Sequence, residues 1–163
     1  MADREANGGD QKDMPVQLVD DPPPLTFVDV PAVAEALTPV RRALADWAAL
    51  AGLPPPDVDD LVLASYEAMA NVVDHAYQPG QRGRFRLEAA CTADLQILVT
   101  VSDYGRWQPL PTDGSSHRGR GLPLIHQLAH RVDVHHDQRG TTCLLYTSPS
   151  PRDRTRSRMP SSA

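Results

Sequence analysis

The order of strand-like and helix-like segments is the feature of this sequence that most constrains its fold. The segments follow from the spacing of apolar residues and from the Pro and Gly residues between them. In chain order we expect a strand at Leu25–Val30, helices at Val33–Ala51 and Asp57–Ala76, strands at Arg84–Cys91 and Leu95–Ser102, a helix from Gly119 to Ala129, and strands at Val132–His136 and from Gly140. Helices and strands come in runs and do not alternate regularly. This order predicts an α+β fold in which helices pack on one face of a mixed, mostly antiparallel sheet.

Length and composition favour one folded domain. A chain of 163 residues can bury one core and is too short for two ordinary domains. Its composition, 40% hydrophobic and 23% charged, is that of a globular protein. The only two cysteines, Cys91 and Cys143, have no metal-binding or redox spacing, so we expect neither a zinc site nor a disulfide framework.

Charge and hydropathy indicate where the chain acts. The N-terminal sequence MADREANGGDQKDM carries charges where a secretory signal needs an apolar stretch. No apolar run approaches the roughly 18 residues that can cross a membrane. We therefore expect a cytoplasmic protein without a membrane partner. The net charge of −5 argues against direct binding to nucleic acid, because phosphate binding needs a basic surface.

Composition divides the chain into three parts. Residues 1–23 are polar and run into the three prolines of residues 22–24, which predicts a disordered leader. Residues 24–142 hold the expected domain. From residue 143 the sequence reads CLLYTSPSPRDRTRSRMPSSA, which lacks apolar periodicity after Tyr146 and resembles the translated read-through of a sequencing adapter. We expect residues 143–163 to be foreign to the natural protein, and a natural basic disordered tail is the alternative.

Three short segments carry candidate ligand-binding residues, and each has a plain structural interpretation. Glu67 and Asn71 are four residues apart on one face of a predicted helix, where a polar stripe can simply face water. Asp103 and Gly105 follow the end of a strand, as in a common turn. The glycines of residues 119–121 open a helix, where free backbone N–H groups can bind an anion, but a lone GxG pattern is a weak signal.

Together, in this order and spacing, the three segments are specific. EAMANVVDHAY at 67–77, VSDYGRW at 101–107 and RGRGLPLI at 118–125 resemble the N, G1 and G2 boxes of the histidine-kinase-like, Bergerat-type ATPase superfamily. Within this superfamily the segments look most like those of the anti-sigma-factor serine kinases. The resemblance spans about Leu25 to Thr142 and implies an ATP-binding domain with this fold.

The resemblance also implies a role for each matching residue. Asn71 would give an amide oxygen to Mg²⁺, which takes most of its other ligands from water and phosphates. Glu67 would be the catalytic general base for an attacking serine hydroxyl. Asp103 would accept a hydrogen bond from the adenine amino group, and Gly105 would let the backbone approach the base.

Other matched positions would complete the cofactor site. The resemblance assigns to nucleotide binding Gly119, Gly121, Leu122 and Thr141. A basic residue before the glycines would touch the γ-phosphate, and we favour Arg118 over His117. Tyr104 and Trp107 are expected to pack rather than bind. The histidines at positions 75, 126, 130, 135 and 136 show no ligand spacing.

As a whole, the resemblance implies an ATP-dependent serine kinase that uses Mg²⁺, binds a sigma factor and phosphorylates a STAS-type anti-sigma antagonist. A homodimer is compatible with it. One alternative is an ATP-dependent partner-binding module without phosphoryl transfer, which would need no base at Glu67. The other is a fragment of a sensor histidine kinase, which is less favoured because no helical hairpin with a phosphoacceptor histidine precedes the domain in this sequence.

Overall fold

A five-stranded antiparallel sheet forms one layer of the molecule. The computed structural model describes residues 21–106 and 121–148. Its strands are β1 (Leu25–Pro31), β2 (Arg84–Cys91), β3 (Ile97–Asp103), β4 (Arg131–Asp137) and β5 (Gly140–Thr147). They lie in the order β1-β2-β3-β5-β4, and the four pairings between them are antiparallel. The expected α+β fold is confirmed, with a sheet simpler than the mixed one that we expected.

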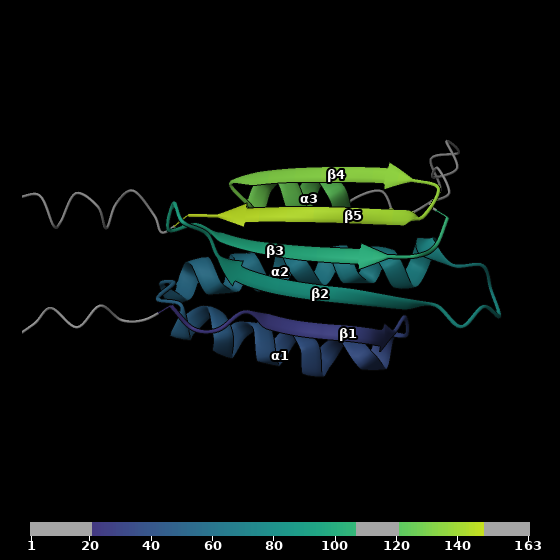
Figure 1. The fold of residues 1–163 in the computed structure, drawn as a ribbon, viewed down its shortest axis with the longest axis horizontal. Helices are drawn as coiled ribbons and strands as arrows, with labels where there is room; N and C mark the ends of the chain where they lie inside the picture. The colour runs from purple at the N-terminus through teal and green to yellow at the C-terminus, as the bar shows by residue number, and fades with distance from the viewer. Residues whose placement is uncertain (1–20, 107–120, 149–163) are drawn as a thin grey trace, which may run out of the picture.

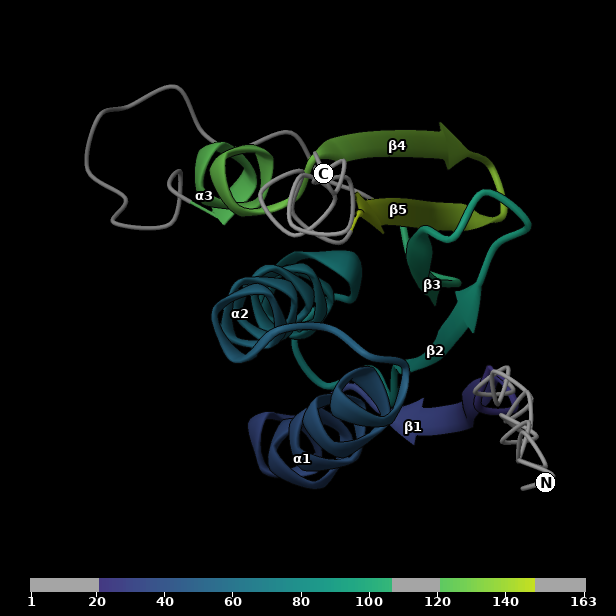
Figure 2. The ribbon, with the colours of Figure 1, turned by 90° about the vertical axis from the view of Figure 1, so that its left-hand side faces the viewer.

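The helices form the second layer and lie on one face of this sheet, as Figure 1 and Figure 2 show. They are α1 (Ala34–Leu50), α2 (Pro55–Asn71), the π-helical turn η1 (Val72–Ala76) and α3 (Gly121–Leu128). Across residues 21–106 and 121–148, no helix combines the length and the apolar character needed to cross a membrane.

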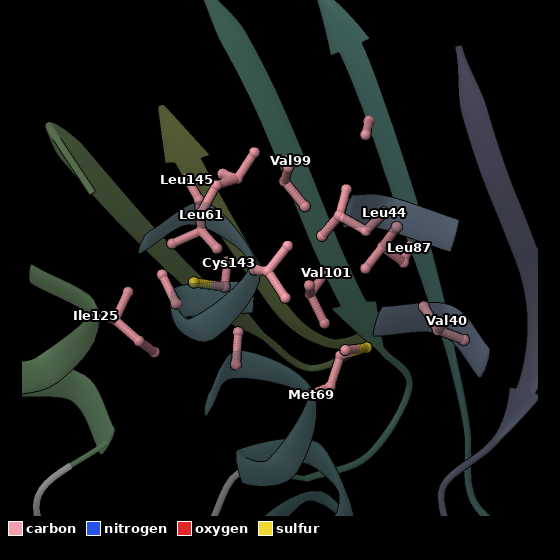
Figure 3. Close-up of a cluster of buried hydrophobic side chains, with 14 of the residues drawn as sticks. Val40, Leu44, Leu61, Met69, Leu87, Val99, Val101, Ile125, Cys143 and Leu145 are labelled. Carbon is pink, nitrogen blue, oxygen red and sulfur yellow. The ribbon is translucent and has the colours of Figure 1, made fainter. Parts of the chain in front are cut away.

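Side chains from both layers make one apolar core (Figure 3). Alternate residues of β2 and β3 point inward, which gives the fully or nearly fully buried Phe85, Leu87, Ala89, Ile97, Val99 and Val101. The helices cover them with apolar residues at helical spacing, chief among them Leu37, Val40, Leu44, Leu61, Met69 and Ile125. Each large side chain buried in this way contributes about 1.5–3 kcal/mol of transfer free energy.

Strand β5 extends further than we expected. It lies between β3 and β4, and Leu145 pairs with Val99 on one side and Val132 on the other. Leu145 is fully buried, and Cys143 and Thr147 are buried on the same face. The expected domain boundary at residue 142 is therefore five residues too early, because this short alternation suffices to complete a central strand. The foreign origin of the tail stays a prediction.

The second expected helix does not remain α-helical to its end. The segment expected at residues 57–76 begins at Pro55, since proline suits the first turn of a helix, and becomes a π-turn after Asn71. A π-turn closes i→i+5 hydrogen bonds and often occurs at functional sites. The change from an α-helix to a π-turn rotates the residues that follow Asn71, and Val72 and Ala76 are the buried ones.

Candidate functional site

A pocket lies between the end of α2, the start of α3 and the ends of strands β3, β4 and β5. Four residues predicted from the sequence line it together, Asn71, Asp103, Leu122 and Thr141. The rest of its wall is mainly apolar and is formed by Ala68, Val72, Ala76, Val101, Ile125, Val134, Cys143 and His136. Few polar groups on apolar walls are typical of a small-molecule site.

Asp103 is the buried carboxylate of this pocket. It ends strand β3 and is only 7% exposed. Its Oδ1 accepts hydrogen bonds from the backbone N–H of Gly105, at 3.0 Å, and of Thr141, at 3.2 Å. Within the described part of the chain, no hydrogen bond engages Oδ2. Burial raises the pKa of Asp103, while the two N–H donors and the charge of His136 oppose that rise.

Two glycines allow the backbone to close around Asp103. A Cβ atom on Gly105 would overlap the carbonyl group of Ala76 in η1. Gly140 has a φ of +145°, and a Cβ there would overlap the carbonyl oxygen of Asp103. Gly105 was predicted to let the backbone approach a ligand base. The structure gives a second reason why this position needs a glycine, which is its close contact with the end of η1.

Asn71 and Glu67 present polar groups from α2. Asn71 is the last residue of α2 and lines the pocket, whereas Glu67, one turn earlier, is not among the lining residues. Both are half-buried. Among the residues that the structure describes, neither the Glu67 carboxylate nor the Asn71 amide makes a hydrogen bond or ion pair with the protein. Val72 and Ala76, the first and last residues of η1, continue the pocket wall beyond Asn71.

His136 is a pocket residue that the sequence analysis missed. A hydrogen bond of 3.1 Å joins its Nδ1 to Oγ1 of Thr141, and its charge acts on Asp103. The register of the β4–β5 hairpin pairs His136 directly with Thr141. His136 could have been found from the sequence by pairing the two expected hairpin strands residue by residue, because this pairing places His136 opposite Thr141.

The remaining predicted residues lie near the pocket or outside the described residues. Gly121 is the first residue of α3, so the N-terminus of that helix adjoins the pocket beside Leu122. Arg118, Gly119 and the alternative His117, with Trp107, lie outside the described residues. The expectation that Tyr104 packs is wrong, since its side chain is 59% exposed.

Comparison with known proteins identifies the family of this domain. Residues 30–147 match the family described as the histidine kinase-like ATPase domain. The chain belongs to this family. The match ends at Thr147, where β5 ends, which supports the corrected boundary of the histidine kinase-like ATPase domain.

Relatives of this histidine kinase-like ATPase domain include the RsbW serine-protein kinases. The chain is 34% identical over 121 residues to serine-protein kinase RsbW of Halalkalibacterium halodurans, covering 66% of this chain and 74% of the relative. It is 30% identical over 118 residues to serine-protein kinase RsbW of Bacillus velezensis, covering 64% and 74%. These matches place the chain, at family level, among the serine-protein kinases.

A solved structure shows the same fold. The RsbU and RsbW domains of Rv1364c from Mycobacterium tuberculosis match with a TM-score of 0.62 and 29% identity. The match covers 78% of this chain and 32% of the longer protein, so this chain spans about a third of it.

Proposed function

We propose that this chain binds Mg·ATP in the described pocket and transfers the γ-phosphate to a serine of a STAS-type anti-sigma antagonist, and that it also binds a sigma factor. The main support for the proposal is that Asn71, Asp103 and Thr141, from three separate elements, line one pocket of a domain that is similar to RsbW. A cytoplasmic place of action and a homodimer, both expected from the sequence, belong to this proposal.

The adenine end of the site is formed by Asp103. Its Oδ2 accepts the hydrogen bond of the adenine amino group, since Oδ1 is already engaged by Gly105 and Thr141. Thr141 supports the carboxylate through its backbone N–H. Leu122 adds to the apolar wall. Gly105 is not among the lining residues of this pocket, and it contributes to base binding through its backbone N–H, which orients the Asp103 carboxylate. A base with an oxo group in place of the adenine amino group would have no donor for Oδ2 of Asp103, which would then be a buried acceptor without a partner.

Asn71 forms the phosphate end. Among the described residues no group of three or more His, Cys, Asp and Glu side chains could hold a metal ion. A hard amide oxygen at the pocket wall fits Mg²⁺, which is bound by few protein ligands and completes its shell with phosphate oxygens and water. When bound, Mg²⁺ neutralises phosphate charge. Gly119, Gly121 and Arg118 contact the phosphates in this proposal, by resemblance to the family.

Glu67 is the general base of the proposed transfer. Its carboxylate accepts the proton of the serine hydroxyl as the hydroxyl oxygen attacks the γ-phosphorus, the bond from this phosphorus to the β–γ bridging oxygen breaks, and ADP leaves. The side chain lies one helical turn before Asn71, so the base and the proposed metal ligand share one helix face. A pure binding module has no use for a base at this position, and this favours the kinase over the alternative without phosphoryl transfer.

The proposal is tested by incubating the purified chain with labelled ATP and with a STAS protein encoded beside the gene of this chain. We expect label on one serine of the STAS protein, located by mass spectrometry, with wild-type chain and Mg²⁺. Glu67→Gln should lose the transfer, while Glu35→Gln, the same change at an exposed position of α1, should keep it. If the wild type transfers no label yet binds a sigma factor only with ATP, the binding module is the correct function.

A further inference from the structure

Tyr77 follows the π-turn and has no part in the mechanism proposed above. It is the last residue of the EAMANVVDHAY segment and adopts an extended conformation, with φ −127° and ψ 146°. Its hydroxyl donates a hydrogen bond to the carbonyl oxygen of Arg84, at the start of β2. Its ring packs on Gly83, where a Cβ atom would overlap the ring. The side chain is therefore fixed at both its ring and its hydroxyl.

The same hydroxyl holds the segment that follows Asp103. It accepts a hydrogen bond of 3.0 Å from the backbone N–H of Tyr104, 27 residues later in the chain. A hydroxyl has one proton to donate and lone pairs to accept, so it can make both bonds at once. The next residue, Gly105, lies against the carbonyl group of Ala76. Two consecutive residues at the end of η1 thus contact two consecutive residues after Asp103.

This contact bears on the adenine end because Gly105 is a donor to Asp103. The Gly105 N–H binds Oδ1 at 3.0 Å, so a displacement of residues 104–105 would remove one of the two bonds that orient the carboxylate. We propose that Tyr77 is a positioning residue for the adenine end, which holds the Tyr104 backbone so that Asp103 presents Oδ2 to the base. This inference rests on the proposed function of the pocket.

Nucleotide discrimination in the Tyr77→Phe variant tests the inference. The probes are ATP and inosine triphosphate, whose base carries an oxo group in place of the amino group, and binding is measured by calorimetry. Without the Tyr77 hydroxyl, residues 104–105 can shift, and the buried Asp103 carboxylate loses its bond from the Gly105 N–H. Loss of one partner of a buried polar group typically costs enough to reduce binding about tenfold. We expect the preference for ATP to fall by about that factor. Tyr104→Phe is the matched control, because its backbone N–H remains and its exposed ring makes no hydrogen bond in the described residues.

The outcomes separate positioning from a purely structural role. A lower melting temperature in Tyr77→Phe with an unchanged preference for ATP overturns the inference. A wild type without any preference for ATP contradicts the proposed function itself. If Tyr77→Phe does not fold, hydrogen exchange of the Tyr104 amide in the wild type decides: slow exchange supports the bond to Tyr77, and exchange at the rate of an unstructured peptide overturns it.

Discussion

The two ends of the pocket differ in how the protein supports them. At the proposed adenine end, Asp103 accepts two backbone hydrogen bonds, His136 is hydrogen-bonded to Thr141, and the Tyr77 hydroxyl is hydrogen-bonded to the Tyr104 backbone. At the proposed phosphate end, Asn71 lines the pocket and Glu67 lies one helical turn before it on α2, and neither side chain makes a hydrogen bond or ion pair with the described residues. One end is a network of hydrogen bonds within the protein, and the polar side chains of the other end lie outside that network.

This difference separates recognition from chemistry in the proposed site. A carboxylate already oriented by backbone donors loses little freedom when a base binds, so the adenine end is preorganised. Groups that ligate a metal or accept a proton need their lone pairs for the ligand. We therefore expect changes at the phosphate end to affect transfer and metal dependence, and changes at the adenine end to affect every adenine nucleotide alike.

The largest effect is expected at Glu67. The Glu67→Gln variant keeps the shape of the side chain but cannot accept the serine proton, and loss of a general base typically lowers the rate about 10²- to 10⁴-fold. Affinity for ATP should stay within several-fold of wild type. Single-turnover transfer to the STAS substrate measures the rate, and an undiminished rate would remove Glu67 from the mechanism.

The next effect concerns Asn71. Asn71→Ala should remove the gain in ATP affinity that Mg²⁺ provides, because it removes the only proposed protein ligand of the metal. Removing a residue that only hydrogen-bonds to a metal ligand already lowers metal affinity about 10- to 100-fold, so removing a ligand itself should lower it at least as much. Calorimetry with and without Mg²⁺ gives the difference. Binding of AMP, which lacks the outer phosphates, is the control and should not change. Wild-type Mg²⁺ dependence in a folded variant would refute the assignment.

A smaller effect follows from the raised pKa of Asp103. Because burial raises this pKa above the ordinary value of 3.8, the free protein takes up the proton at a higher pH than an exposed aspartate does. The ionised form accepts the amino-group hydrogen bond, so ATP affinity should be full above the raised pKa and fall, by about tenfold per unit at most, as pH drops through it. In Asp103→Asn this part of the pH dependence should be absent. The same profile in both proteins would show that another group titrates.

The smallest effect is expected for the chain beyond β5. Deleting residues 149–163 should leave the melting temperature nearly unchanged, because this Ser-, Pro- and Arg-rich sequence has no apolar periodicity. Leu145→Ala, inside β5, should by contrast cost about 2–5 kcal/mol, as for other fully buried leucines. Thermal unfolding of both variants makes the comparison. A large loss of stability on deletion would mean that the tail contributes to the fold.

Patterns of apolar residues predicted most of the fold, and local geometry explains the exceptions. Strand β2 has the expected bounds, Arg84–Cys91, because its alternation ends at clear turn residues. The length of β5 was underestimated because its last residues were interpreted by composition, while burial between β3 and β4 decides their structure. The π-turn of η1 has no sequence signal of its own, and its last residue, Ala76, lies against Gly105 from a distant part of the chain.

Site residues were predicted where their chemical type fits a motif, and they were missed where only strand pairing or a long-range contact places them near the pocket. Asn71 and Asp103 were predicted because an amide and a carboxylate at these spacings fit the family motifs, and both line the pocket. His136 was missed because its place in the pocket comes from its register with Thr141. Tyr77 was quoted within a motif, but its contact with Tyr104 joins residues 27 positions apart.

A crystal structure of the chain with Mg²⁺ and a non-hydrolysable ATP analogue tests the central claim most directly. We predict that the adenine amino group donates a hydrogen bond to Oδ2 of Asp103, that Mg²⁺ is bound by the amide oxygen of Asn71, and that Oδ1 of Asp103 keeps its hydrogen bonds from Gly105 and Thr141. Nucleotide bound outside this pocket, or a metal ion bound without Asn71, would contradict it.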